Sequence, residues 1–218
     1  MSSLYGRRSF VSAVASLTGL AVARLSARQE PTGQPTGSAT EGFDLAWLDE
    51  VQGQHKQLYD LGGHQLSSDP QPLRFARNFL DTFRDVYRLE FPDIDTAIGI
   101  SGPAFPMNAS DRLWVKYKLG ERASIVDPMT QQPAERNIFY DDGSDTSVTA
   151  LEARGTTFWQ CNVAVGVISQ QLATAFQVPV ADVRADVVAG LNPGVRLMPS
   201  HVMAIALAQE RGFSYMKP

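Results

Sequence analysis

The chain has 218 residues, of which 44% are apolar and 19% are charged, and its formal net charge is -4 at pH 7. This balance excludes a disordered or fibrous protein and predicts one folded domain around a single core. The acidic charge, with no Lys/Arg cluster after the first 27 residues, disfavours nucleic acid as a partner, so we expect a small molecule or another protein.

Residues 1–27 have the pattern of a twin-arginine signal peptide. Arg7 and Arg8 precede a polar residue and Phe10, and the stretch from Phe10 to Ala23 is uncharged and moderately apolar. It is too short to cross roughly 30 Å of hydrocarbon as a stable helix, and it ends in a run of small residues that is typical of a cleavage site. We therefore expect export to the periplasm without stable membrane insertion, the alternative being a disordered basic tail.

Residues 28–42 predict a disordered tether, because Pro, Gly, Thr, Ser and Gln dominate them and cannot bury enough apolar surface to fold. Residues 43–218 form the predicted domain. The single cysteine, Cys161, excludes an intramolecular disulfide. A lone thiol in an oxidising compartment must be buried or used.

The first elements of the domain are a predicted strand over residues 56–61 and a helix that opens at Asp69-Pro70. The apolar residues of this helix recur at helical spacing and define an inner face: Ala76, Phe79, Leu80, Phe83, Val86 and Tyr87. Residues 96–100 are nearly all apolar, which is typical of a strand covered on both faces. A second helix is predicted from Ser110 to Gly120, with Gly120 as its C-cap.

A polar insertion over residues 121–147 predicts a long loop or lid. The elements expected after it are a helix over 149–154, a strand over 156–160, a helix capped by Asn162 with an inner stripe of Val165, Ile168, Leu172 and Phe176, a helix over 180–189, a strand over 195–198, a helix over 202–211 and a strand over 213–216. Strands alternate with helices throughout. This alternation predicts an α/β fold with right-handed crossovers, a mainly parallel sheet and helices on both faces.

Three blocks in the last part of the chain resemble the DsrE/DsrF-like family of sulfur-relay proteins: LEARGTTFWQCN from Leu151, PGVRLMPS from Pro193 and AQERGFSY from Ala208. The resemblance implies a flavodoxin-like three-layer sandwich with a five-stranded, mainly parallel sheet. It also implies assembly as a homo-oligomer, a trimer or a hexamer, and a persulfide carried on the matching cysteine, Cys161. This chain differs from the better known members by its export signal and by the insertion over residues 121–147.

Cys161 is the main candidate for chemistry, because it is predicted at the carboxyl end of a strand and directly before a helix. Free N–H groups and the positive end of the helix stabilise a thiolate at such a place. The alternative is a buried structural cysteine, since Phe158 and Trp159 beside it suit a core strand.

Two histidines are predicted at the same sheet edge, His64 after the first strand and His201 after the penultimate one. Either could hold the thiolate or shuttle a proton. A His/His/Cys set could also bind zinc or copper, but the spacing matches no metal motif, so we predict no metal and no cofactor. His55 is expected at the opposite edge, in solvent.

The sequence therefore favours an exported, oligomeric protein that accepts and donates sulfane sulfur through Cys161, with His64 and His201 as helpers. Its partner would be a small sulfur-containing molecule or a partner protein. The alternative is a non-catalytic periplasmic module that uses the same fold to bind a small ligand, a metal or a protein.

Overall fold

The computed structural model describes residue 43 and residues 45–218, so the predicted signal peptide and tether lie outside the described residues. The strands are β1 (His55–Leu61), β2 (Ile94–Ile100), β3 (Thr157–Cys161), β4 (Arg196–Met198) and β5 (Ser214–Met216). The helices are α1 (Trp47–Glu50), α2 (Gln71–Tyr87), the 3₁₀-helix η1 (Gly102–Asn108), α3 (Asp111–Tyr117), α4 (Leu119–Ala123), α5 (Val148–Glu152), α6 (Asn162–Phe176), α7 (Val180–Ala189) and α8 (His201–Glu210).

The five strands form one all-parallel sheet in the order β4-β3-β2-β1-β5. This confirms the predicted α/β class and is consistent with a flavodoxin-like three-layer sandwich. From β1 to β4 each new strand is added on the same side of the sheet, and then β5 returns to the far side of β1. Because parallel crossovers are right-handed, this reversal sends α8 to the face opposite the helices that connect β1 to β4.

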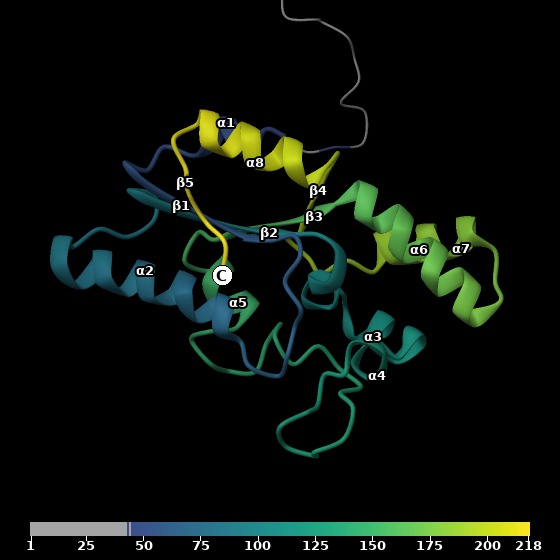
Figure 1. Ribbon diagram of the computed structural model, residues 1–218. Helices are drawn as coiled ribbons and strands as arrows, with labels where there is room; N and C mark the ends of the chain where they lie inside the picture. The colour runs from purple at the N-terminus through teal and green to yellow at the C-terminus, as the bar shows by residue number, and fades with distance from the viewer. Residues whose placement is uncertain (1–42, 44) are drawn as a thin grey trace, which may run out of the picture. The chain divides into compact units, whose positions relative to one another are not determined.

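The two faces of the sheet are covered by different helices (Figure 1). Helices α2 and α5 lie on one face, and α1 and α8 lie on the other. The larger core cluster joins the first face to side chains of α3, α6 and α7. The smaller cluster packs α1 and α8 against the other face around Trp47 and Trp159, whose ring centroids lie 5.8 Å apart.

The predicted helix from Ser110 to Gly120 is wrong in its second half. Lys118 adopts a left-handed conformation with φ 50° and ends α3, and a separate short helix, α4, follows. Gly120 lies inside α4 and not at a C-cap, because its missing side chain lets the helix backbone approach Ala134.

Two further expectations need correction. The inner face of α2 ends earlier than predicted, since Val86 and Tyr87 are 64% and 65% exposed while Ala76 and Leu80 are buried. Helix α6 is capped by Cys161 and not by Asn162, because the Cys161 sulfur accepts the hydrogen bond of the third helical N–H. The residue that caps α6 is therefore the same cysteine that is the candidate reactive group.

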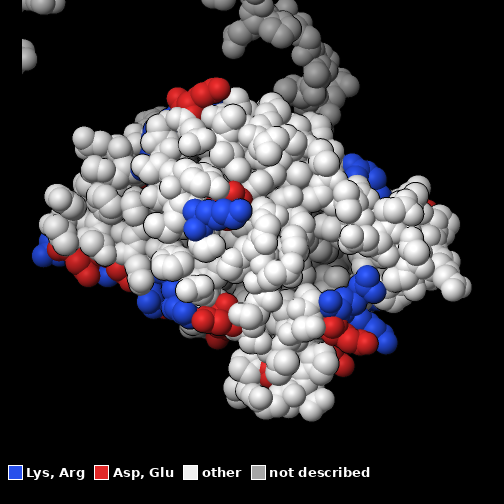
Figure 2. Space-filling view, in the orientation of Figure 1, with Lys and Arg blue, Asp and Glu red and all other residues white. Residues whose placement is uncertain are grey.

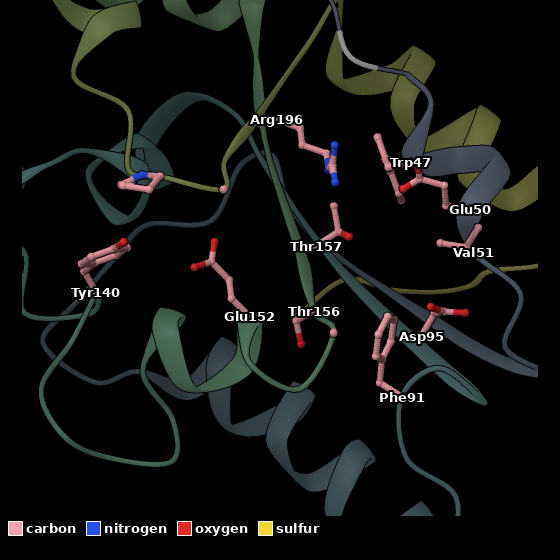
Figure 3. A pocket seen from close by; sticks show the side chains of 13 residues that line it. Trp47, Glu50, Val51, Phe91, Asp95, Tyr140, Glu152, Thr156, Thr157 and Arg196 are labelled. Carbon is pink, nitrogen blue, oxygen red and sulfur yellow. The ribbon is translucent and has the colours of Figure 1, made fainter.

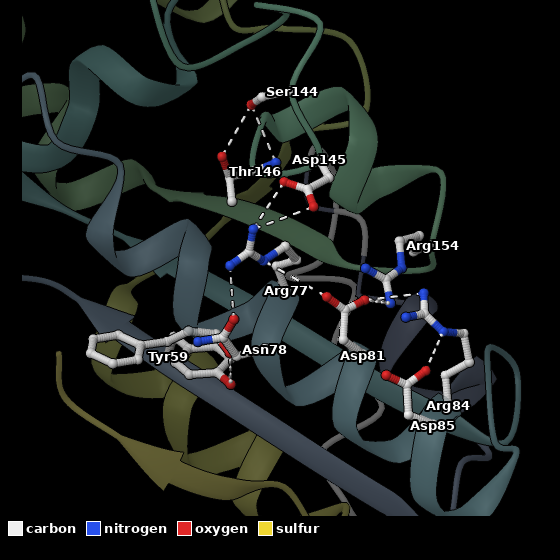
Figure 4. A network of polar contacts seen from close by, with 11 residues as sticks. Tyr59, Arg77, Asn78, Asp81, Arg84, Asp85, Ser144, Asp145, Thr146 and Arg154 are labelled. Atoms are coloured by element: carbon white, nitrogen blue, oxygen red, sulfur yellow. Dashed lines mark hydrogen bonds and ion pairs between the residues drawn. The ribbon is translucent and has the colours of Figure 1, made fainter.

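The segment over residues 121–147 begins within α4 and otherwise contains no helix or strand, as its composition predicted. Four of its side chains are nevertheless buried in the larger core: Ile125, Ala134, Ile138 and Phe139. Figure 4 shows a second anchor, in which Arg77 of α2 forms an ion pair with Asp145 of the segment. The segment is thus a packed part of the domain and has little freedom to act as a lid.

Charged side chains are spread over the surface in small groups of both signs on the face that Figure 2 shows. Within the described part of the chain, no helix combines the length and apolar character needed to span a bilayer.

Candidate functional site

Cys161 lies at the carboxyl edge of the sheet, where the fold changes direction. Strand β3 ends at Cys161 and leads into α6 on one face, while its neighbour β4 leads into α8 on the other. Helices that diverge from adjacent parallel strands leave a crevice at their common edge, which is the usual ligand site of open α/β sheets.

The cysteine sulfur accepts two backbone hydrogen bonds, one from each of these helices. The N–H of Ala164 in α6 donates to Sγ at 3.4 Å, and the N–H of His201 in α8 donates at 3.3 Å. Both donors belong to the first turn of a helix of ten or more residues, where N–H groups lack intrahelical acceptors and the helix dipole is positive. Two such ends meeting at one sulfur stabilise negative charge on it.

The imidazole ring of His201 is held by two partners other than the sulfur. Trp159 Nε1 donates to His201 Nδ1 at 3.3 Å, and His201 Nε2 lies 2.6 Å from Oδ1 of Asp60. Because an indole N–H can only donate, Nδ1 must accept, which assigns the ring proton to Nε2 and makes Nε2 the donor to Asp60. This pairing occupies both ring nitrogens.

Asp60 completes this buried network from β1. Its carboxylate accepts hydrogen bonds from Tyr215 Oη at 2.6 Å and from the N–H of Gly62 at 2.7 Å, in addition to His201. Burial acts to raise the pKa of Asp60, but the hydrogen bonds from Tyr215, His201 and Gly62 outweigh it and hold the pKa below its ordinary value. Asp60 is therefore a charged anchor that orients His201.

A cavity of about 540 Å³ opens beside the sulfur. Its walls are mostly small and apolar, and its residues come from the ends of β1, β2 and β3 and from α4 and α6: Gln65, Ser101, Gly102, Pro103, Arg122, Ala123, Cys161, Val163, Ala164, Val167, Ile168 and Gln171. Arg122 is the one charged residue in this lining, and it is exposed. The cavity can therefore admit a small, partly apolar molecule and meet a negative group on it.

The two predicted helpers of Cys161 have different positions. His201 is brought to the sulfur, although through its backbone N–H and not through its ring. His64 follows β1 as expected, where its N–H donates to the carbonyl of Leu61, but it is not part of the cavity lining. His55 is partly buried and its ring lies 4.6 Å from that of Phe83, so it is not the solvated residue that we expected.

Sequence reasoning missed four residues around this site: Asp60, Arg122, Trp159 and Tyr215. Asp60 carried a readable signal, because a carboxylate among the apolar residues at the end of a strand, here LYDL, is unusual unless it is paired. Trp159 was considered only as a core residue beside Cys161, and Arg122 and Tyr215 become neighbours of the site only through tertiary packing. Among the described residues, no three His, Cys, Asp or Glu side chains are grouped so that they could hold a metal ion.

Comparison with known proteins identified no relative of this chain. No family model matches the chain, and no significant match was found among curated proteins or among solved structures.

Proposed function

We propose that the protein accepts sulfane sulfur on Cys161 and passes it on. The observation that carries this proposal is the position of the Cys161 sulfur. It lines a cavity and accepts hydrogen bonds from N–H groups in the first turns of two helices. A thiolate is the nucleophile in sulfur exchange, and N–H donors from two helix starts favour negative charge on the sulfur. The resemblance to the DsrE/DsrF-like family is consistent with this chemistry.

The transfer requires no metal, oxidant or reductant. The Cys161 thiolate attacks the terminal sulfur of a donor such as thiosulfate, and an S–S bond forms between them. The sulfur–sulfur bond of the donor breaks, and sulfite leaves with the electron pair. Cys161 then carries a persulfide anion, whose inner sulfur is the atom that accepts the hydrogen bonds of the two N–H groups and whose charge lies mainly on the outer sulfur.

Arg122 is the feature of the cavity that selects the donor in this proposal. Thiosulfate and sulfite are anions, and a guanidinium presents a planar set of donors to anionic oxygens. The apolar side chains Val163, Val167 and Ile168 on the same walls limit how much water surrounds the reacting sulfur.

A second candidate is a binding module in which Cys161 is only part of the wall. The low exposure of the cysteine, 4%, favours it, because a reactive thiol must be reached by its substrate. In that case the cavity holds a small ligand or a segment of a partner protein, and no covalent step occurs.

The deciding experiment is incubation of the native protein with thiosulfate followed by intact mass measurement. The proposal expects a gain of one sulfur atom that is removed by a reducing thiol, and no gain in Cys161→Ser. Cys161→Ala serves as a second variant, since it leaves no hydroxyl in the buried position. A native protein that remains unmodified by thiosulfate and by a glutathione persulfide, and whose thiol reacts only after unfolding, would support the binding module instead.

We also propose that the protein is exported through the twin-arginine pathway and works in the periplasm. Receptors of this pathway read paired arginines specifically, so Arg7→Lys combined with Arg8→Lys should leave full-length protein in the cytoplasm. Normal processing of that double variant would exclude this route.

A further inference from the structure

A second cavity, of about 470 Å³, lies at the opposite edge of the sheet and has no part in the chemistry of Cys161. It is bounded by the amino ends of β2, β3 and β4 and by α1 and α5 (Figure 3). In Figure 3, Tyr140 and Glu152 line one side and Trp47 and Glu50 the other. The carboxyl edge is the usual ligand site of such sheets, so a cavity here requires its own explanation.

Two of the polar groups in this wall have no hydrogen-bond partner. Oε1 of Glu152 is fully buried and unpartnered, and so is Nε1 of Trp47, a residue that is only 2% exposed. Native proteins leave few buried polar atoms unpaired, because each one costs about 1–3 kcal/mol. The Glu152 oxygen lacks a hydrogen-bond donor, which a ligand with N–H groups in this cavity would supply. The indole N–H of Trp47 lacks an acceptor instead, so only the Glu152 oxygen points to a donor ligand.

The charges of the lining define the ligand class. Three carboxyl groups, those of Glu50, Asp95 and Glu152, line the cavity together with one guanidinium, that of Arg196. Burial alone raises the pKa of Glu152 to about 7, and burial also raises the pKa of Asp95 although the N–H of Gly53 opposes this. A positive group placed among them would offset the cost of burying their charge.

The shape of the lining favours an organic cation over a metal ion. Within the described residues the acidic side chains do not converge as a set of metal ligands. The rings of Trp47, Phe91 and Tyr140 instead provide flat apolar walls, and Phe91 is 55% exposed. Aromatic faces attract ammonium and guanidinium groups and also pack against the apolar body that carries them.

We propose that this cavity binds an organic cation, an ammonium or guanidinium group on a flat apolar body, and that Glu152 is the carboxylate that receives it. The cavity volume suits a molecule of the size of an amino acid derivative. This binding is independent of the sulfur chemistry at the other edge of the sheet.

The test uses the full-length protein and two probes of the same shape, benzylammonium and benzyl alcohol, in titration calorimetry and ligand-observed NMR at pH 7.5. Benzylammonium should bind at least about tenfold more tightly than the neutral alcohol. Glu152→Gln should remove this preference and leave the weak affinity for benzyl alcohol unchanged. Glu121→Gln, which removes one carboxylate from an exposed position on α4, is the matched control and should keep the preference.

The comparison of the two probes on the unmodified protein holds even if Glu152→Gln were to misfold, which circular dichroism would reveal. Equal affinity for the two probes, binding of neither probe, or an unchanged preference in a folded Glu152→Gln protein would overturn the proposal. None of these outcomes bears on sulfur transfer by Cys161.

Discussion

At the scale of single residues, the backbone and the ring of His201 have different roles at the Cys161 site. The backbone of His201 contacts the sulfur, and its ring belongs to a closed set of hydrogen bonds with Asp60 and Trp159. The sulfur is thereby stabilised by fixed dipoles that do not change with protonation, while the ring holds the start of α8 in place. The one charged side chain in the cavity lining is that of Arg122.

The role of Arg122 can be measured without any sulfur donor. Iodoacetate and iodoacetamide alkylate the same thiol and differ in charge, so the ratio of their rates reports the electrostatics of the cavity. Arg122→Gln should lower the iodoacetate rate relative to the iodoacetamide rate by about threefold at low salt, and added salt should shrink the difference. Arg88→Gln removes an exposed arginine at the far end of α2 and should leave the ratio unchanged. An unchanged ratio in Arg122→Gln would remove this residue from the donor site.

Glu152 predicts a pH dependence of stability. Its pKa is about 7 in the folded protein against an ordinary value of 4.5, so between these values the folded state holds a proton that the unfolded state has released. The free energy of unfolding should therefore fall by at most about 3 kcal/mol as the pH rises from about 4.5 to about 7. Above that pH it should level off. Denaturant titrations of wild type and Glu152→Gln across this range should diverge accordingly, with the variant gaining relative stability at high pH. Parallel curves would show that Glu152 has an ordinary pKa in the folded protein.

At the scale of elements, close packing between backbones decides where helices end. Helix α3 stops at Lys118 because the chain turns through a left-handed residue, and α4 then presses Gly120 against the backbone of the segment over residues 121–147. The same segment buries Ile125 and Phe139 in the main core. The segment over residues 121–147 is polar by composition, but a few buried apolar side chains hold it against the core.

Gly120→Ala tests this packing. A β-carbon at Gly120 would overlap the carbonyl oxygen of Ala134, which is backbone and cannot rotate away. The substitution should lower the free energy of unfolding by about 3 kcal/mol, measured by urea denaturation. Gly63→Ala is the control, since a β-carbon there meets no atom within 4 Å. Equal stability of the two variants would mean that the backbone around Ala134 shifts to accommodate the added carbon at little cost in free energy.

At the scale of the whole molecule, exposed valines surround the edge of the sheet that carries Cys161. Val163 and Val167 on α6 are 61% and 55% exposed, and Val202 at the start of α8 is 76% exposed. Apolar side chains gathered near a reactive group favour contact with another protein, either a partner or a second copy of the chain.

We expect the purified protein to be a homo-oligomer, a trimer or a hexamer, with this edge near the contact. Light scattering at micromolar concentration should give a mass of several chains, and Val202→Asp should shift it toward the mass of one chain because a charge in an apolar contact is costly. Thr174→Asp, on an exposed position nearer the other end of α6, should leave the mass unchanged. A monomeric wild-type protein would contradict the expectation.

The sequence by itself determined the class of fold and most of the elements, since helical and strand periodicities are local properties of the chain. The short helices α1, η1 and α4 were not predicted. The strand–helix alternation predicted the parallel sheet, and Cys161 and His201 were both predicted at its carboxyl edge because both follow strands. The extent of α2 and the division of the helix after Ser110 were missed, since exposure and backbone approach depend on neighbours distant in sequence.

Only the tertiary structure decided what each group touches. Tyr215 reaches Asp60 because β5 pairs with β1 across more than 150 residues of chain, and no local pattern encodes that pairing. The return of the chain to that edge also sends α8 to the opposite face from α6, which brings two helix ends to one sulfur. The cavity around Glu152 arises in the same way, from the starts of three strands that are neighbours only in the folded sheet. Hydrogen bonds and burial act at distances of a few ångströms in space, whereas sequence patterns report only distance along the chain.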